Sequence, residues 1–114
     1  MAMEAALKAI AEPRRREILR LVWDSERSAG DIAAHFEVSR PAISQHLRVL
    51  KEADLVTERR DGTHRFYRAN PDGLAELRVF LEGFWEESLA DLKRVAEAEE
   101  RSRRADGTND ERHP

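Results

Sequence analysis

The chain has 114 residues, of which 40% are hydrophobic and 38% are charged, and it contains no cysteine. This length supports one small domain with little core to spare, so a dimer would add stability. The absence of cysteine excludes a disulfide framework and a thiolate metal site. The apolar runs are short and no signal peptide opens the chain, so we expect a cytoplasmic protein without a membrane partner.

The net charge of −3 is unevenly distributed along the chain. Residues 1–71 carry 13 Lys and Arg against 11 Asp and Glu, whereas residues 72–114 carry 7 against 12. Within residues 39–68 there are 7 basic and 4 acidic side chains. This modest basic excess suits a nucleic-acid contact in the middle of the chain that depends on a dimer.

Two short helices are expected at the N-terminus. The first covers Met3–Ala11 and places Leu7 and Ile10 on one side. Pro13 begins the second, whose first turn contains three arginines, residues 14–16. Cations at this end oppose the helix macrodipole. They either contact phosphate or an acidic partner, or they form a solvated face, which we favour for the first two arginines.

Two further helices joined by a tight turn are expected over residues 28–55. Ser28 and Ser39 are the N-cap residues of these helices, and Glu37-Val38 forms the turn between them. A step of 100° per residue along the second helix places three large apolar side chains on one buried face: Ile43, Leu47 and Leu50.

The opposite face of this second helix is polar in its N-terminal half. Arg pairs with guanine, Gln with adenine, and Ser with a base or the backbone, so this face is typical of a recognition helix in the DNA major groove. His46 lies at the edge of the buried face, where a phosphate contact and a structural role are equally compatible with its position. The residues expected in the groove are Ser39, Arg40, Pro41, Ser44, Gln45 and Arg48.

After Leu55 the apolar pattern changes from helical to alternating, which predicts a β-hairpin with Asp61-Gly62 at its turn. Val56 and Phe66 are expected to face the core. Cations near the turn suit contact with the DNA backbone or the minor groove, although charged edge strands also serve simply to prevent aggregation. The hairpin residues expected to contact DNA are Arg59, Arg60, His64 and Arg65.

A long helix is expected from about residue 72 to about residue 101. Its apolar stripe is wider than a small domain needs for its own core, so another surface must cover part of it. We assign residues 1–98 to one domain. Residues 99–114, which are rich in charge and turn formers, are expected to form a disordered tail.

Three blocks of the chain resemble the ArsR family of bacterial winged helix-turn-helix transcriptional regulators: LKAIAEPRRREILRLV, SRPAISQHLRVLKEADLV and RRDGTHRFYR. The expected fold is mainly α with a small β-hairpin, that is, five helices with a two-stranded wing. The resemblance implies a homodimer, joined through the first and last helices, that represses transcription at a palindromic operator. The implied interface residues are Leu7, Ile10, Leu77, Phe80, Leu81, Phe84, Trp85 and Leu92.

The chain departs from the metal-sensing members of that family. They use cysteines near the third helix or histidine and carboxylate ligands on the last helix, whereas this chain has no cysteine and residues 72–101 contain no histidine. We therefore expect no metal and no cofactor. A small-molecule effector near Phe84 and Trp85, a protein effector and constitutive repression all remain open.

No catalytic pattern accompanies these elements. The sequence contains no nucleophile elbow, phosphate-binding glycine loop or metal-ligand cluster, so an enzyme is not expected. The alternative to a DNA-binding regulator is a winged helix that binds another protein. The polar and cationic face of the second helix in residues 28–55 favours DNA.

Overall fold

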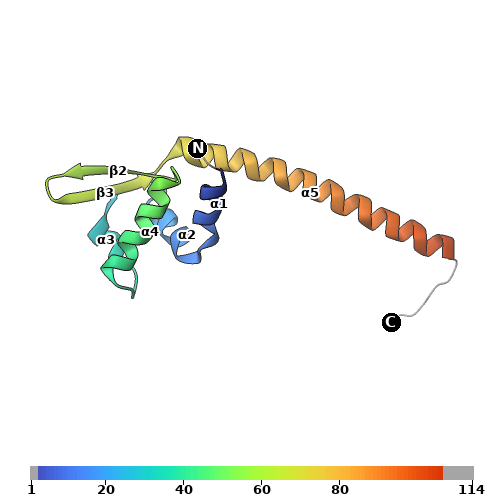
Figure 1. The fold of residues 1–114 in the computed structure, drawn as a ribbon, viewed down its shortest axis with the longest axis horizontal. Helices are drawn as coiled ribbons and strands as arrows, with labels where there is room; N and C mark the ends of the chain where they lie inside the picture. Colours follow the sequence, from blue (N-terminus) through green and yellow to red (C-terminus); the bar gives the residue numbers. More distant parts are fainter. Residues whose placement is uncertain (1–2, 107–114) are drawn as a thin grey trace. The chain divides into compact units, whose positions relative to one another are not determined.

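A computed structural model describes residues 3–106 (Figure 1). The chain divides after Arg78 into two units, which are described separately below. The five helices that the sequence predicts are present, and the sheet has one strand more than predicted. The elements are α1 (Met3–Ala11), α2 (Pro13–Leu21), β1 (Arg27–Ser28), α3 (Ala29–Ala33), α4 (Arg40–Glu52), β2 (Val56–Asp61), β3 (His64–Ala69) and α5 (Pro71–Asp106).

The core of the first unit is formed by the apolar faces of its helices together with one face of the hairpin. Ile43, Leu47 and Leu50 of α4 are each at most 1% exposed, as their helical spacing predicted. Burying each of these side chains contributes roughly 1.5–3 kcal/mol to the free energy of unfolding. Because this face is fully covered, α4 has a fixed orientation and its polar face is directed away from the core.

Leu77, which was expected at a dimer interface, is only 5% exposed and belongs to the core cluster of its own protomer. The sequence showed one continuous apolar stripe along the last helix and gave no sign of where the core contact ends. Leu7 and Ile10 of α1 are half-buried and pack against the same core. The first turns of α5 therefore complete the first unit, and Leu77 is not available to a partner.

The sheet has three antiparallel strands in the order β1-β3-β2. Gly62 and Thr63 form the turn between β2 and β3, and Gly62 has a φ of 64°, which a glycine adopts without strain. The added strand β1 pairs Arg27 with Tyr67 and Ser28 with Phe66. The prediction of a two-stranded wing missed β1 because two residues are too few to show an alternating pattern.

The strand register determines which hairpin side chains face the core. Val56 pairs with Ala69, whereas Phe66 pairs with Arg59, and residues directly opposite one another lie on the same face of the sheet. Tyr67 is 3% exposed and lies on the face of Val56. Phe66 is half-buried on the other face, so the expectation that it faces the core beside Val56 is wrong.

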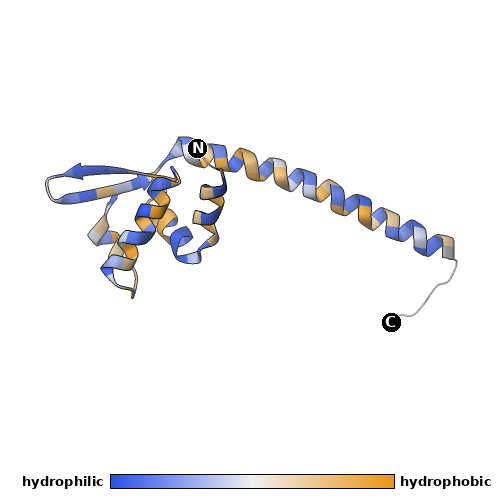
Figure 2. Cartoon of the chain, in the orientation of Figure 1, coloured by the Kyte–Doolittle hydropathy of each residue, from blue (hydrophilic) through white to orange (hydrophobic). Residues whose placement is uncertain are grey.

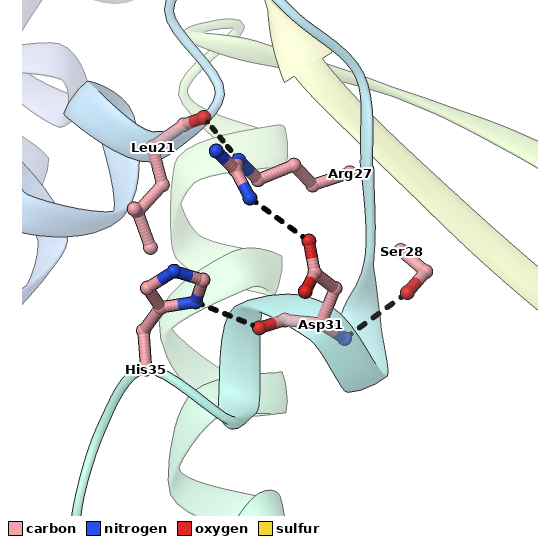
Figure 3. Close-up of polar contacts among 5 residues, drawn as sticks. All are labelled: Leu21, Arg27, Ser28, Asp31 and His35. Carbon is pink, nitrogen blue, oxygen red and sulfur yellow. Dashed lines mark hydrogen bonds and ion pairs between the residues drawn. The ribbon is translucent and has the colours of Figure 1, made fainter.

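Hydrogen bonds around the start of α3 fix the segment between α2 and α4 (Figure 3). The N–H of Asp31 donates to Oγ of Ser28 at 3.0 Å, which confirms Ser28 as the N-cap. Arg27 donates from Nε to the carbonyl oxygen of Leu21 at 2.8 Å and from Nη1 to Oδ2 of Asp31 at 3.0 Å. Nδ1 of His35 donates to the carbonyl oxygen of Asp31 at 2.9 Å. These bonds join the end of α2, β1 and α3.

Arginines at the start of α2 cap the end of α1. Arg15 and Arg16 donate to the carbonyl oxygens of residues 8–10 at 2.7 to 3.1 Å. The last carbonyl groups of a helix have no partner within the helix, so the guanidinium groups satisfy them. Nη1 of Arg15 also lies 3.3 Å from Nδ1 of His46. His46 therefore has a structural contact that joins α4 to α2.

The second unit consists of residues 79–106 of α5, along which hydrophobic residues recur (Figure 2). The helix continues to Asp106, so the expected disordered tail is wrong for residues 99–106, and residues 107–114 lie outside the described part of the chain. Ion pairs at i,i+4 spacing, Glu99 with Arg103 and Glu100 with Arg104, stabilise this end of the helix. The exposed large apolar side chains are Val79, Phe80, Leu81, Phe84, Trp85, Leu89, Leu92 and Val95.

Candidate nucleic-acid interface

α4 exposes the polar side chains that the sequence predicted on its outer face. Oγ of Ser39 accepts a hydrogen bond from the N–H of Ala42 at 3.3 Å, so the hydroxyl caps the helix. Gln45 and Arg48 are joined, because Nη2 of Arg48 donates to Oε1 of Gln45 at 2.6 Å. A guanidinium has five N–H donors, so Arg48 retains donors for a base or a phosphate.

A cleft of about 430 Å³ lies between α4 and the hairpin. Four cationic side chains line it, Arg48 and Lys51 from α4 and Arg60 and Arg65 from the strands, against one carboxylate, that of Glu58. This excess of positive charge beside the polar face of α4 attracts a phosphate backbone. The other lining residues are Pro41, Ser44, Gln45 and Tyr67.

Glu58 connects the two walls of the cleft. Its Oε1 accepts a hydrogen bond from Nζ of Lys51 at 2.8 Å, and its Oε2 accepts one from the hydroxyl of Tyr67 at 2.9 Å. Oε2 also lies 3.7 Å from Nη1 of Arg65. The Glu58 side chain is only 10% exposed, whereas those of Lys51 and Arg65 are 52% and 41% exposed. The carboxylate is thus covered by the donors that it holds.

These contacts shift the titration of both acidic groups. The hydrogen bond from Lys51, more than that from Tyr67, holds the pKa of the Glu58 carboxyl below its usual value despite burial. Burial, together with the hydrogen bond donated to Glu58, raises the pKa of Tyr67 to about 12. Glu58 is therefore charged and Tyr67 is neutral at pH 7, so the hydroxyl remains a donor to the carboxylate.

A second hollow lies at the tip of the hairpin, between the turn and the start of α3. It brings Arg40 and His64 together, and Arg65 lines both this hollow and the cleft. Of the residues predicted to contact DNA, Arg40 and His64 are therefore at the tip, apart from the main cleft.

Arg59 is not brought into either hollow. Its guanidinium forms two hydrogen bonds to the carboxylate of Glu26, at 2.9 and 2.8 Å, and its central carbon lies 4.6 Å from the ring centre of Phe66. Because side chains alternate along a strand, Arg59 lies on the opposite face of β2 from Arg60. Arg59 braces the hairpin against the loop before β1, whereas the prediction placed it with the DNA contacts.

Three residues of the cleft were missed from the sequence: Lys51, Glu58 and Tyr67. Lys51 continues the helical spacing of Ser44 and Arg48 by one more turn, which was a usable signal. Glu58 lies two residues after Val56 and so shares its side of the strand. A two-residue turn at either 61–62 or 62–63 places Tyr67 on the face of Val56, so the predicted hairpin held a usable signal for this residue as well.

Residues 3–106 contain neither a metal-binding cluster nor a helix that could cross a membrane. No group of three or more histidine or carboxylate side chains in this range is arranged to hold a metal ion. No helix in the same range is both long and apolar enough to span a bilayer.

The sequence of this chain is similar to those of known regulators. Residues 12–58 match the model of the family described as bacterial regulatory protein, arsR family. The HTH-type transcriptional regulator Rv2034 of Mycobacterium tuberculosis is 41% identical over 96 residues, which cover 84% of this chain and 90% of that protein. The transcriptional repressor SdpR of Bacillus subtilis is 44% identical over 68 residues, which cover 60% of this chain and 76% of that protein.

The fold is similar to that of a solved relative. The homodimeric winged helix-turn-helix DNA-binding domain of Mb0332 from Mycobacterium bovis matches with a TM-score of 0.60 and 32% identity, over 74% of this chain and 78% of that one. The matched family segment runs from the start of α2 into β2 and so includes α4 and one strand of the cleft. The chain therefore belongs to the arsR family of bacterial regulatory proteins, whose members are DNA-binding transcriptional regulators and not enzymes.

Proposed function

We propose that the protein is a homodimeric, sequence-specific DNA-binding repressor that acts in the cytoplasm at a palindromic operator. The observation that carries this proposal is the cleft between α4 and the hairpin. It places the side chains that can distinguish bases, Gln45 and Arg48, beside cations that can hold phosphates. One face of the protein thus offers both kinds of contact that specific DNA binding needs.

Each group of residues has a distinct role in this proposal. Ser44, Gln45 and Arg48 contact base edges in the major groove, with Ser39 and Pro41 fixing the first turn of α4 close to the DNA. Lys51, Arg60 and Arg65 hold phosphates on either side of the groove. Arg40 and His64 extend this contact at the tip of the hairpin.

A second protomer is proposed to cover the apolar stripe of the second unit. Large contiguous apolar patches are uncommon on the surface of monomers and usually mark an interface. The M. bovis relative is a homodimer, which supports the same state here. The proposed interface consists of Phe80, Leu81, Phe84, Trp85 and Leu92 of α5, with Leu7 and Ile10 of α1. A two-fold dimer presents two recognition helices to two half-sites, which is the reason to expect a palindromic operator.

The repressor assignment and the independence from metal have separate support. The B. subtilis relative is named a transcriptional repressor, and a protein that occupies a promoter through two half-sites excludes other proteins from it. The chain contains no cysteine, and its described residues offer no cluster of histidine and carboxylate groups. We propose that its occupancy of the operator does not depend on a transition metal.

Fluorescence anisotropy tests the DNA-binding part of the proposal. The protein is titrated into labelled DNA from upstream of its own gene, into a sequence selected by the protein from random DNA, and into scrambled DNA, at several salt concentrations. We expect tight binding to at least the selected sequence, with a log–log salt slope of several units. Selection of no sequence, together with equal weak binding to the upstream and the scrambled DNA, would overturn the proposal and favour a protein partner.

Sedimentation equilibrium tests the dimer with a matched pair of variants. Leu92 and Val79 are both 64% exposed, but they lie about 140° apart around the helix axis, and Val79 is off the stripe. Leu92→Lys is expected to shift the protein to monomers and to abolish cooperative binding to two half-sites, while Val79→Lys leaves a dimer. Equal behaviour of the two variants would contradict the proposed interface.

A further inference from the structure

We infer that Glu58 is a positioning residue that sets the specificity of DNA binding. Its carboxylate holds the two walls of the cleft at a fixed separation and, through its charge, weakens contacts with DNA of any sequence. This inference rests on the proposed function. Its basis is the pairing of one covered carboxylate with cations from α4 and from the hairpin.

The packing of α4 and the hairpin supports a fixed separation of the two walls. α4 is packed against the core by its apolar face, whereas the outer half of the hairpin extends beyond that core. At the level of Glu58 the two elements are joined by a polar link, in which Lys51 donates to one carboxylate oxygen and Tyr67 to the other. Because Tyr67 is itself buried, moving the carboxylate would break a partly buried hydrogen bond. The distance between the recognition helix and the cations of β3 is thus fixed before DNA binds.

The charge of Glu58 opposes the binding of any DNA in the cleft. A carboxylate in the cleft repels phosphates that enter it. Lys51 and Arg65 are also occupied by Glu58, so a phosphate must compete for them. Binding to arbitrary DNA depends almost entirely on phosphate contacts and counterion release, and it therefore bears the full effect of this competition. Binding to the operator gains base contacts from the preset position of α4, which offset the competition.

The variant Glu58→Gln separates charge from shape. It retains the size of the side chain and an oxygen that can accept from Lys51, but it removes the negative charge and weakens the link to the cations. We expect its affinity for scrambled DNA to rise about tenfold at low salt, with a log–log salt slope steeper by about one unit. Affinity for the selected sequence should rise less, so the ratio of the two affinities falls several-fold.

Glu52→Gln is the matched control. Glu52 is an exposed residue at the end of α4, next to Lys51 in the sequence, and it does not line the cleft. The variant Glu52→Gln removes one negative charge from the same region without releasing Lys51 or Arg65. A general effect of net charge would change both variants alike, whereas the inference requires a change of the affinity ratio in Glu58→Gln alone.

Tyr67→Phe provides a second test that does not alter charge. It removes the hydroxyl donor to Glu58 while the ring still fills the core. We expect weaker binding to the selected sequence, unchanged binding to scrambled DNA and an unchanged salt slope. Circular dichroism and thermal unfolding establish that each variant is folded before its affinities are compared.

The outcomes distinguish this inference from the proposed function. If the wild-type protein selects no sequence, both the proposed function and the role of Glu58 are overturned. If the wild type selects a sequence but Glu58→Gln and Tyr67→Phe keep its affinity ratio, the proposed function stands and the role of Glu58 is overturned. If Glu58→Gln does not fold, an unchanged ratio in Tyr67→Phe alone overturns the inference, because the hydroxyl is one of the donors that fix the carboxylate.

Discussion

The start of α5 contacts the end of α4 through Gly73 and the backbone of Asp54. A Cβ added to Gly73 would lie 1.8 Å from the carbonyl oxygen of Asp54, and Nδ2 of Asn70 donates to the same oxygen at 3.0 Å. This contact lies within the first unit. The first turn of α5 therefore fixes the C-terminal end of the recognition helix, and only glycine allows the approach.

Replacing Gly73 should be destabilising. We expect Gly73→Ala to lower the free energy of unfolding by about 1–3 kcal/mol, because the added methyl group forces the two backbones apart. Urea denaturation followed by circular dichroism measures the change. Gly83→Ala is the control, since a Cβ there meets nothing within 4 Å and alanine favours a helix by up to about 1 kcal/mol. A loss of stability in both variants would contradict the steric explanation.

The end of α4 offers a stabilising substitution. Asp54 has a φ of 62°, and the N–H of Leu55 donates to the carbonyl oxygen of Leu50 while that of Asp54 donates to Lys51, which is the pattern of a Schellman motif. Glycine is the usual residue at this position, so Asp54→Gly should raise the free energy of unfolding by up to about 1 kcal/mol. Asp54→Ala, which retains the strained backbone, should lower it. If urea denaturation found Asp54→Ala more stable than Asp54→Gly, the assignment of a Schellman motif at the end of α4 would be refuted.

Two adjacent arginines of β2 should respond differently to substitution. Arg60→Ala is expected to weaken binding to all DNA sequences and to reduce the log–log salt slope by about one unit, because Arg60 lines the cleft. Arg59→Ala is expected to leave the slope unchanged and to lower the thermal midpoint, because Arg59 binds Glu26 and covers Phe66. Anisotropy at several salt concentrations and thermal unfolding measure both effects. A reduced slope in Arg59→Ala would place that residue on the DNA.

Substitution of the linked pair on α4 should affect sequence discrimination. Gln45→Ala or Arg48→Ala should each cost about 1–3 kcal/mol on the selected sequence and relax specificity at the contacted base pair. Because the two side chains are hydrogen-bonded, the double variant should cost less than the sum of the single ones. Competition assays with single-base variants of the selected sequence measure these changes. Full discrimination in both single variants would mean that α4 does not enter the groove as proposed.

The contacts of the Glu58 carboxylate should affect how the free energy of unfolding changes at acid pH. Its pKa is held below the usual 4.5 in the folded protein, so the unfolded chain takes up a proton at a higher pH than the folded one does. The stability that this carboxylate contributes is therefore present above pH 4.5 and is lost as the pH falls through its folded value. Urea denaturation of the wild type and Glu58→Gln from about pH 6 to pH 3 should show a flatter curve for the variant. Parallel curves would show that the carboxylate is not stabilised by its partners.

Local patterns were sufficient for the elements whose signals lie within a few residues. The N-caps Ser28 and Ser39 and the buried face of α4 were predicted because capping and helical periodicity depend only on neighbouring positions. The face of Phe66 was assigned wrongly. A two-residue turn at 61–62, as expected, or at 62–63, as observed, places Tyr67 and not Phe66 on the face of Val56, because side chains alternate along each strand.

Contacts between distant residues could not be predicted in this way. Arg59 is cationic and close to the turn, as a DNA contact would be, and only the fold brings Glu26 to it across 33 positions of sequence. The helix capping by Arg15 likewise depends on how α1 and α2 meet. The length of α5 was underestimated because residues 99–106 contain no apolar side chain besides that of Ala105, while their i,i+4 ion pairs favour a helix without a core.

The alternation of side chains along β2 and β3 has a consequence for how this regulator could diverge or be redesigned. Residues that face α4, such as Arg60 and Arg65, alternate with residues on the other face, where Arg59 holds the hairpin to the loop before β1 and packs on Phe66. Substitutions in the first set would therefore change the proposed phosphate contacts while the second set preserves the scaffold. An insertion of one residue in either strand would exchange the two sets and abolish both properties at once.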